Sequence, residues 1–169
     1  MKQAVTEIAQ LTDAPLAIDT SDAAALEAGL RAYHGRALIN SVSAEDARIR
    51  DFLPLAKKYG AAILCLPITE DGVPKTAEAR LKTVQFIISK AKEAGLKDGD
   101  FLLDALVMTV SADKDACREV LRTLQLYRQH LATRPPWVFP ISPLACRTAR
   151  SSTAPSLPCA SPPVSMRPS

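Results

Sequence analysis

The stretch Ala61-Ala-Ile-Leu-Cys-Leu66 is a short apolar run that ends at Pro67, a pattern typical of a strand covered on both faces. After a polar turn, residues 76–94 form an amphipathic segment whose apolar side chains recur at helical spacing: Leu81, Val84, Ile87, Ile88 and Ala91. Gly95 then supplies a helix stop. A buried strand followed by a helix of this length predicts one βα unit of a parallel sheet.

The same unit recurs along the chain on both sides of this stretch. Strands are predicted at residues 15–19, 37–40, 61–66 and 101–107, and the helices that follow them at 21–33, 44–59, 76–94 and 113–131. Pro54 is expected to interrupt or bend the second of these helices. One face of the fourth is expected to carry Val120, Leu121, Leu124 and Leu131. Residues 1–11 look like the end of a preceding helix, and the whole of residues 1–131 predicts an α/β domain.

The character of the chain changes after this domain. From Pro135 to Ser169 there are nine of the thirteen prolines, seven serines and no acidic residue, without helical or strand periodicity. Such a segment cannot bury enough apolar surface to offset the entropy lost on ordering. Residues 132–169 are therefore expected to form a disordered tail rich in Pro, Ser and Arg.

Charge and hydropathy exclude some classes of partner. The formal net charge is +3, but Arg147, Arg150 and Arg167 lie after Pro135, and the numbers of basic and acidic residues before Pro135 are equal. A neutral body gives no electrostatic basis for nucleic-acid binding. The longest apolar run is far shorter than the roughly 20 residues that a membrane helix needs, and the first residues show no signal-peptide pattern. We expect a cytoplasmic protein without a nucleic-acid or membrane partner.

The cysteines are not arranged as metal ligands. The chain has four, Cys65, Cys117, Cys146 and Cys159, and no CxxC pair among them. Cys65 lies inside an apolar strand, where a small buried thiol is the expected role. The sequence also lacks a nucleophile elbow, a P-loop and a dinucleotide-binding fingerprint. No metal site is expected, and no catalytic residue is assigned.

Polar residues lie at or near the carboxyl ends of three predicted strands: Asp19, Asn40 and Asp104. Strands of a parallel sheet are normally apolar, and in β/α-barrels their carboxyl ends form the active face. An Asp or Asn between a strand and a helix is also often only a cap or an Asx-turn, and taken singly each residue fits that interpretation better. Asp104 is harder to explain as a cap, because apolar residues flank it and a buried carboxylate needs a donor from protein or ligand.

The turn after the second strand is unusually polar. Ser41, Ser43 and Glu45 follow Asn40 directly, and they either line a polar pocket or cap the next helix. Residues 69–72 follow the third strand in the same way, although Asp71-Gly72 is also an ordinary turn signal. His34, Lys57 and Lys58 are expected on solvated helix or turn surfaces.

Several of these segments, read in order, resemble one family. Pro15-Leu-Ala-Ile-Asp-Thr20, Ala37-Leu-Ile-Asn-Ser-Val-Ser-Ala-Glu45 and Leu55-Ala-Lys-Lys-Tyr-Gly-Ala61 look like the pterin-binding methyltetrahydrofolate:corrinoid methyltransferases. Gly72-Val-Pro-Lys-Thr76 and Leu103-Asp-Ala-Leu-Val-Met-Thr-Val-Ser111 continue the resemblance, which covers residues 1–131. The family includes the corrinoid/iron-sulfur protein methyltransferase and the folate module of cobalamin-dependent methionine synthase.

The resemblance implies a fold, a site and a reaction. The fold would be a partial (β/α)8 TIM barrel of about four βα units, the third to the sixth of the family. Asp19, Asn40 and Asp104 would bind the pterin, and Ser41, Ser43 and Glu45 would line its pocket. The substrate would be 5-methyltetrahydrofolate, whose N5 methyl group passes to the cobalt of a corrinoid (cobalamin) carried by a partner protein. Intact members of the family can form homodimers.

The resemblance also shows what is missing. Only four of the eight units are visible, and the family's late Gly-Val-Ser-Asn strand, whose asparagine stabilises charge at N5, is absent. The chain by itself is therefore expected to be inactive, and one alternative is a non-catalytic, truncated fragment. Another is a different pterin-binding barrel such as dihydropteroate synthase, which is less favoured because its phosphate-site signatures are not found.

The missing strand led to a hypothesis about the reading frame. Trp137 is encoded by TGG and the codon of Val138 begins with GT, so the triplet offset by two bases is GGT, glycine. With suitable wobble bases the offset frame reads Leu-Gly-Val-Ser-Asn-Ile-Ser-Phe-Gly-Leu-Pro, which contains the family's strand. We hypothesise a frameshift near Leu131, and a gene whose offset frame does not encode this strand would overturn the idea.

Overall fold

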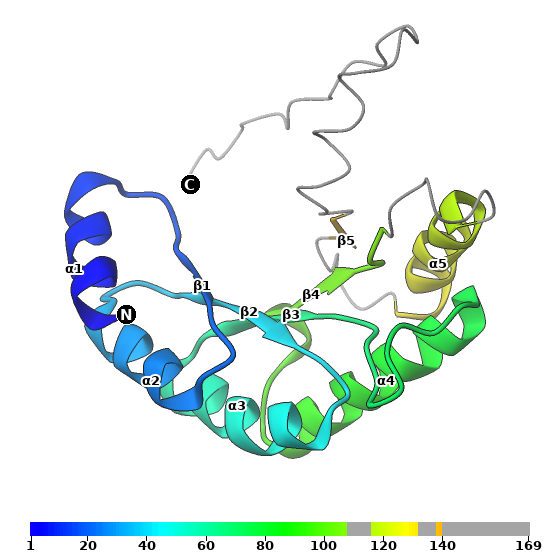
Figure 1. Ribbon diagram of the computed structural model, residues 1–169, viewed down its shortest axis with the longest axis horizontal. Coiled ribbons are helices and arrows are strands. Elements are labelled where there is room, and N and C mark those ends of the chain that lie inside the picture. The colour runs from blue at the N-terminus through cyan, green and yellow to red at the C-terminus, as the bar shows by residue number, and fades with distance from the viewer. Residues whose placement is uncertain (108–115, 132–137, 140–169) are drawn as a thin grey trace, which may run out of the picture.

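The computed structural model describes residues 1–107, 116–131 and 138–139. Within them one sheet has the strand order β1-β2-β3-β4-β5, and Figure 1 shows α1 to α5 following one another in an arc along one side of it. Every strand pairs in parallel with its neighbour in the sequence. This is the arrangement of a β/α-barrel wall, so the predicted α/β fold and partial TIM barrel are confirmed.

The four predicted strands all form. They are β1 (Ala17–Asp19), β2 (Leu38–Val42), β3 (Ala62–Cys65) and β4 (Phe101–Asp104). A fifth strand, β5 (Val138–Phe139), lies beside β4 within the segment that was expected to be disordered. The other residues of that tail lie outside the described residues.

The helices also follow the prediction. They are α1 (Lys2–Leu11), α2 (Ala23–Ala32), α3 (Asp46–Tyr59), α4 (Ala77–Glu93) and α5 (Ala116–His130), with a short 3-10 helix, Asp98–Asp100, before β4. The expected start of α5 at residue 113 lies outside the described residues. In the part of the chain that the structure describes, no helix is both long and apolar enough to cross a membrane.

Local signals explain where the helices begin and end. Asp22 caps α2, because its carboxylate accepts hydrogen bonds from the backbone N–H groups of Ala24 (2.8 Å) and Ala25 (3.3 Å). Thr76 caps α4 in the same way, through the N–H of Ala79 (3.3 Å). Gly60 ends α3 with a φ of 64°, a left-handed conformation that glycine adopts without steric cost.

An interruption of α3 at Pro54, one of the two effects expected of this residue, is not found. The helix runs through this residue as one element from Asp46 to Tyr59. Pro54 lies on the exposed side, whereas its neighbours Phe52 and Leu53 are buried in the core. Packing of this face holds the helix together despite the hydrogen bond that a proline cannot donate.

The core lies between the sheet and the arc of helices. Strand register aligns Ile18, Ile39, Ile63 and Phe101 as one row across β1 to β4, and all four side chains are buried. They belong to one apolar cluster with helix residues such as Leu26, Phe52 and Val84. Burial of a side chain of this size stabilises a fold by about 1.5–3 kcal/mol, so this row fixes which face of the sheet meets the helices.

The predicted apolar face of α5 was wrong at one residue, Leu121. Val120 is buried and Leu124 and Leu131 pack against the core, but 63% of the surface of Leu121 is exposed. The buried positions are taken instead by Thr123 and Tyr127, neither of which is accessible to solvent. The helix is therefore rotated so that a hydroxyl-bearing stripe, and not Leu121, meets the neighbouring elements.

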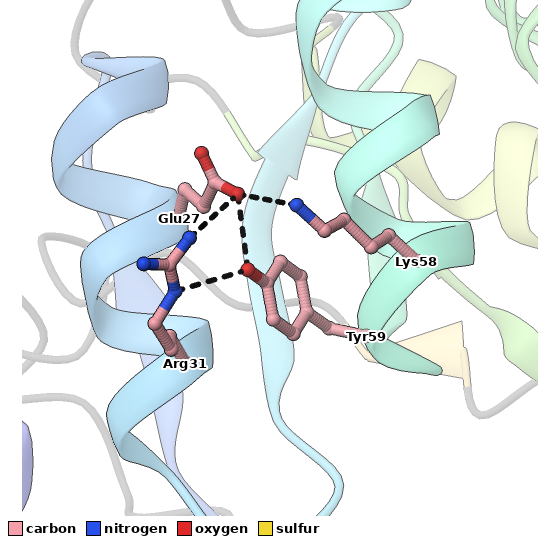
Figure 2. A network of polar contacts seen from close by, with 4 residues as sticks. All are labelled: Glu27, Arg31, Lys58 and Tyr59. Atoms are coloured by element: carbon pink, nitrogen blue, oxygen red, sulfur yellow. Dashed lines mark hydrogen bonds and ion pairs between the residues drawn. The ribbon is translucent and has the colours of Figure 1, made fainter.

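A polar network joins α2 to α3 on the outside of the arc. Figure 2 shows the Glu27 carboxylate between Arg31, Lys58 and Tyr59. One oxygen of Glu27 accepts from Lys58 Nζ (2.7 Å), Tyr59 Oη (3.0 Å) and Arg31 Nη2 (3.4 Å). The hydrogen bond from Lys58 is the main reason that the pKa of Glu27 lies below its usual value. The predicted surface position of Lys58 is confirmed, and its role is to pair two adjacent helices.

Candidate functional site

Asp19, the last residue of β1, lies beside Asn40, which is the third residue of β2 and not its last residue, as the sequence had predicted. The parallel register pairs Asp19 with Asn40 directly, and neighbouring strands lie about 4.8 Å apart. Since side chains alternate along a strand, both residues project on the face opposite the buried pair Ile18 and Ile39. Asp19 is exposed and Asn40 is half-buried. The carboxylate and the amide therefore meet on the inner face of the barrel wall.

Asp104 shares this face from two strands away. It ends β4, three residues after Phe101, which belongs to the buried row that meets the helices. The alternation of side chains places Asp104 on the opposite face, with Asp19 and Asn40. Unlike Asp19, it is almost fully buried, with 2% of its surface exposed. The three predicted polar strand ends are thus on one face of one sheet.

The helix caps next to these strands come from other residues. Asp22, not Asp19, caps α2. The first N–H of α3, at Asp46, donates to Glu70 Oε1 (3.0 Å) from the loop after β3. Glu45, the residue that precedes α3, makes no capping hydrogen bond with its side chain. The capping interpretation therefore does not apply to Asp19 or to Asn40, and Glu70 is a cap that the sequence did not single out.

The polar turn after β2 contains a hydrogen-bonded pair of side chains, Ser43 and Glu45. Ser43 is buried, with 4% of its surface exposed, and its hydroxyl donates to the Glu45 carboxylate. Ser41 is half-buried inside β2, which continues two residues beyond the prediction. The register of β2 against β3 shifts between Ile39 and Val42, which marks an irregularity at Asn40 and Ser41, and the peptide bond between these two residues is cis. Irregular pairing of this kind redirects side chains at the end of a strand.

The carboxylate of Asp104 is held by the turn that follows it. Its Oδ1 atom accepts a hydrogen bond from the backbone N–H of Leu106 (2.8 Å). Leu106 has a φ of 53°, in the left-handed region that non-glycine residues seldom occupy. The protein donor that a buried carboxylate needs is therefore supplied by a tight turn two residues downstream.

Arg80 secures that turn from outside. This residue of α4 has only 3% of its surface exposed, and its Nη1 donates to the carbonyl oxygens of Ala105 (3.1 Å) and Leu106 (3.4 Å). Its Nε donates to the carbonyl of Pro74 in the preceding loop (2.8 Å). Burial lowers the pKa of the Arg80 guanidinium, although arginine remains protonated at neutral pH. Three carbonyl oxygens thus surround one buried charge beside Asp104.

Arg48 occupies a similar place beside Asp19. Its Nη1 donates to the carbonyl of Thr20 (3.2 Å), the residue that follows Asp19, and its guanidinium lies over the ring of Phe52, 4.7 Å from the centroid. Arg48 and Arg80 are both in the first turn of a helix. Each binds the carbonyl directly after a strand-end aspartate. Neither arginine was identified from the sequence.

The sequence does contain a signal for Arg80. Buried residues of α4 follow one another at spacings of three and four: Ala77, Arg80, Val84, Ile87 and Ala91. Arg80 therefore occupies a position of the apolar stripe, where a charged residue requires buried partners. A single arginine in such a stripe indicates a polar anchor, but not which carbonyls it binds.

Comparisons with known proteins identify relatives of this chain. The family described as pterin binding enzyme matches residues 1–150. Methionine synthase from Mycobacterium tuberculosis is 28% identical over 136 residues, which cover 76% of this chain and 11% of the relative. Methionine synthase from Mycobacterium leprae is 28% identical over 125 residues, 70% of this chain and 10% of the relative. The chain spans about a tenth of the length of these relatives.

The match covers every element that carries the three strand-end residues, from β1 to β4. The inner face of the barrel wall described above is therefore part of the matched region. On this basis, the chain belongs to the family of pterin binding enzymes.

Proposed function

We propose that this chain provides the pterin-binding wall of a folate-dependent methyltransferase, with 5-methyltetrahydrofolate as the substrate. The observation that carries the proposal is that Asp19, Asn40 and Asp104 share one face of the sheet, with Asp19 and Asp104 ending β1 and β4 and Asn40 paired with Asp19 from β2. Membership of the pterin-binding family and the likeness to two methionine synthases support it.

The chemistry of these side chains suits a pterin. The edge of the pterin ring presents adjacent N–H donors and a carbonyl acceptor. Carboxylates can accept from the N–H groups, and a side-chain amide can donate to the carbonyl as well as accept from an N–H group. In our proposal Asp104 and Asp19 accept from ring N–H groups, and Asn40 fixes the orientation of the ring between them. Ser41, Ser43 and Glu45 line the same pocket, with Ser43 holding Glu45 in place.

The reaction we propose is methyl transfer. A Co(I) corrinoid carried by a partner protein would act as the nucleophile and would become methyl-Co(III), while N5 would keep the electron pair of the broken N5–methyl bond and gain a proton. The corrinoid would supply the nucleophilic metal, and the residues of this chain would bind and orient the folate. The chain spans about a tenth of the length of the two methionine synthases, and in our proposal its contribution is to bind the folate.

Calorimetric titration of the full chain with 5-methyltetrahydrofolate tests the proposal. We expect saturable binding that Asp104→Ala and Asn40→Ala each weaken by about 10- to 100-fold, because each loses hydrogen bonds in a partly dry site. Asp98→Ala is the matched control: it removes an aspartate before β4, at the opposite end of the strand, and is expected to leave binding unchanged.

Two outcomes would contradict the proposal in different ways. A chain that unfolds cooperatively on heating but does not bind the folate lacks a pterin site. A chain without a cooperative transition behaves as a fragment that needs further βα units, and the assignment of pterin binding to this chain alone would then be wrong.

A further inference from the structure

Arg80 is a buried charged residue that binds the turn directly after Asp104. It reaches from α4 to the turn after β4, where it binds the carbonyls of Ala105 and Leu106. The same turn presents the N–H of Leu106 to Asp104 Oδ1. A chain of hydrogen bonds therefore runs from the guanidinium through two backbone groups to the carboxylate.

Two features indicate that this connection controls the position of Asp104. The first is the left-handed conformation of Leu106, which is unfavourable for leucine and persists only where surrounding contacts determine it. The second is the bond from Arg80 Nε to the carbonyl of Pro74, which anchors the guanidinium in the loop before α4. A planar group fixed at both sides can hold the turn in one geometry, whereas a lysine in its place would offer a single flexible ammonium.

The arrangement differs from an ordinary structural salt bridge. Arg80 donates to three backbone carbonyls, and the partners are the segments immediately before α4 and immediately after β4. Both segments lie at the carboxyl end of the sheet, which is the active face of a β/α-barrel. Desolvation of a guanidinium is costly. A buried arginine is therefore expected at this face only where its contacts contribute to the site.

We propose that Arg80 is a positioning residue for pterin binding, which acts through the turn at residues 104–106 to fix the carboxylate of Asp104. The proposal rests on the proposed function, since it assigns Asp104 to the pterin. Arg80 does not touch the ligand. Its effect on affinity is therefore transmitted entirely by Asp104.

A double-mutant cycle on the full chain tests this coupling. Arg80→Lys is expected to weaken binding of 5-methyltetrahydrofolate by roughly 10- to 100-fold, the range found when residues that orient metal ligands are removed. In the Asp104→Ala background the same substitution is expected to change the affinity by less than about twofold, because nothing remains to be positioned. Arg50→Lys is the control, since Arg50 is exposed and forms an ion pair with its neighbour Asp51.

Amide exchange gives a second readout that does not need the ligand. The N–H of Leu106 is protected by Asp104, and we expect its exchange to accelerate by about tenfold or more in Arg80→Lys but not in Arg50→Lys. Arg80→Gln, which keeps an N–H donor without the charge, is expected to show an intermediate rate. General destabilisation would instead accelerate the protected amides of β2 and β3 to the same extent.

The outcomes separate this inference from the proposed function. If the unmodified chain binds and Arg80→Lys binds equally well, or if the losses in affinity add in the cycle, the positioning role is wrong and the function stands. If the unmodified chain does not bind, the proposed function is overturned and this inference with it. Loss of cooperative unfolding in both Arg80→Lys and Arg80→Gln would assign Arg80 to folding and would also overturn it.

Discussion

Glu119 in α5 accepts a hydrogen bond from the backbone N–H of Ala77, the first residue of α4, at 2.7 Å. The first N–H groups of a helix have no partner within the helix, and a carboxylate also interacts favourably with the positive end of the helix dipole. Thr76 serves the N–H of Ala79 in the same turn. The start of α4, and with it Arg80, is therefore held from the neighbouring helix as well as by its own cap.

Replacement of Glu119 by alanine should lower the free energy of unfolding by about 1 kcal/mol, because a cap and a dipole interaction are lost. This corresponds to a fall in melting temperature of about 2–4 °C for a chain of this size. Thermal unfolding followed by circular dichroism measures the change. Glu78→Ala is the comparison: it removes an exposed ion pair with Arg122 and an acidic side chain from the first turn of the same helix, but no capping hydrogen bond, so it should cost less. An equal or larger loss for Glu78→Ala would contradict the capping role.

The Glu27 network predicts how stability depends on pH. The hydrogen bond from Lys58 lowers the pKa of Glu27 in the folded chain below its usual value of 4.5. The stabilisation is therefore fully present above the unfolded pKa and is lost as the pH falls through the folded pKa. Between pH 5 and about pH 3, the melting temperature of the unmodified chain should fall more steeply than that of Glu27→Gln.

The matched control for this prediction is Glu7→Gln, which removes an exposed carboxylate of α1 that, among the described residues, accepts a hydrogen bond from Gln3. Its pH profile should follow that of the unmodified chain. If Glu27→Gln showed the same slope as both, the contacts in Figure 2 would not contribute to stability in solution.

The fold could be predicted because its signals are local. A run of apolar residues marks each strand, and a 3.6-residue period marks each helix, so β1 to β4 and α1 to α4 appear where expected. The face of α5 could not be predicted in full. Val120 and Leu121 are adjacent in the sequence and point in directions about 100° apart, so only one of them can meet the core. The stripe that does so continues through Thr123 and Tyr127, whose polar groups made the apolar count misleading.

The candidate site was only partly accessible to sequence reasoning. Asp19, Asn40 and Asp104 could be found because a polar residue at the end of an apolar strand is conspicuous. Arg80, Arg48 and Glu70 could not, because each acts on the backbone of another βα unit and such a contact leaves no spacing in the sequence. A polar residue at the end of an apolar strand is thus easier to recognise in a sequence than a side chain that binds the backbone of another unit.

The two described cysteines should differ strongly in reactivity. Cys65 ends β3 and is fully buried, and burial raises the pKa of its thiol to about 12. At pH 8 only about one such thiol in ten thousand is ionised, and the thiolate is the reactive form. Cys117 in α5 is exposed. Alkylation of the native chain, followed by peptide mapping, should label Cys117 rapidly and Cys65 only after unfolding. Labelling of both at similar rates in the native chain would contradict the buried position of β3.

Arg48 contacts the residue after Asp19 much as Arg80 contacts the residue after Asp104, so its effect on binding can be compared with that of Arg80. It binds the carbonyl of Thr20, directly after Asp19, but through one hydrogen bond, whereas Arg80 makes three. On the proposed function, Arg48→Lys should weaken binding of 5-methyltetrahydrofolate less than Arg80→Lys does, by about twofold to tenfold. Asp19 is exposed and has more freedom than Asp104, so one contact restrains it less. A larger loss for Arg48→Lys than for Arg80→Lys would show that Asp19 is the more sensitive of the two aspartates.

The last prediction concerns the gene. We propose that a frameshift near Leu131 replaced the natural continuation of the chain. β5 marks the position beside β4 that the missing strand would occupy. Val138–Phe139 lies beside β4, and the bases that encode Trp137 and the residues after it can read Gly-Val-Ser-Asn in the frame offset by two. The nucleotide sequence should therefore encode this strand in the offset frame. In a chain with that frame restored, the strand next to β4 should carry the asparagine to which the resemblance assigns stabilisation of charge developing at N5 during methyl transfer. Codons that exclude this offset reading would show that the tail is in its natural frame.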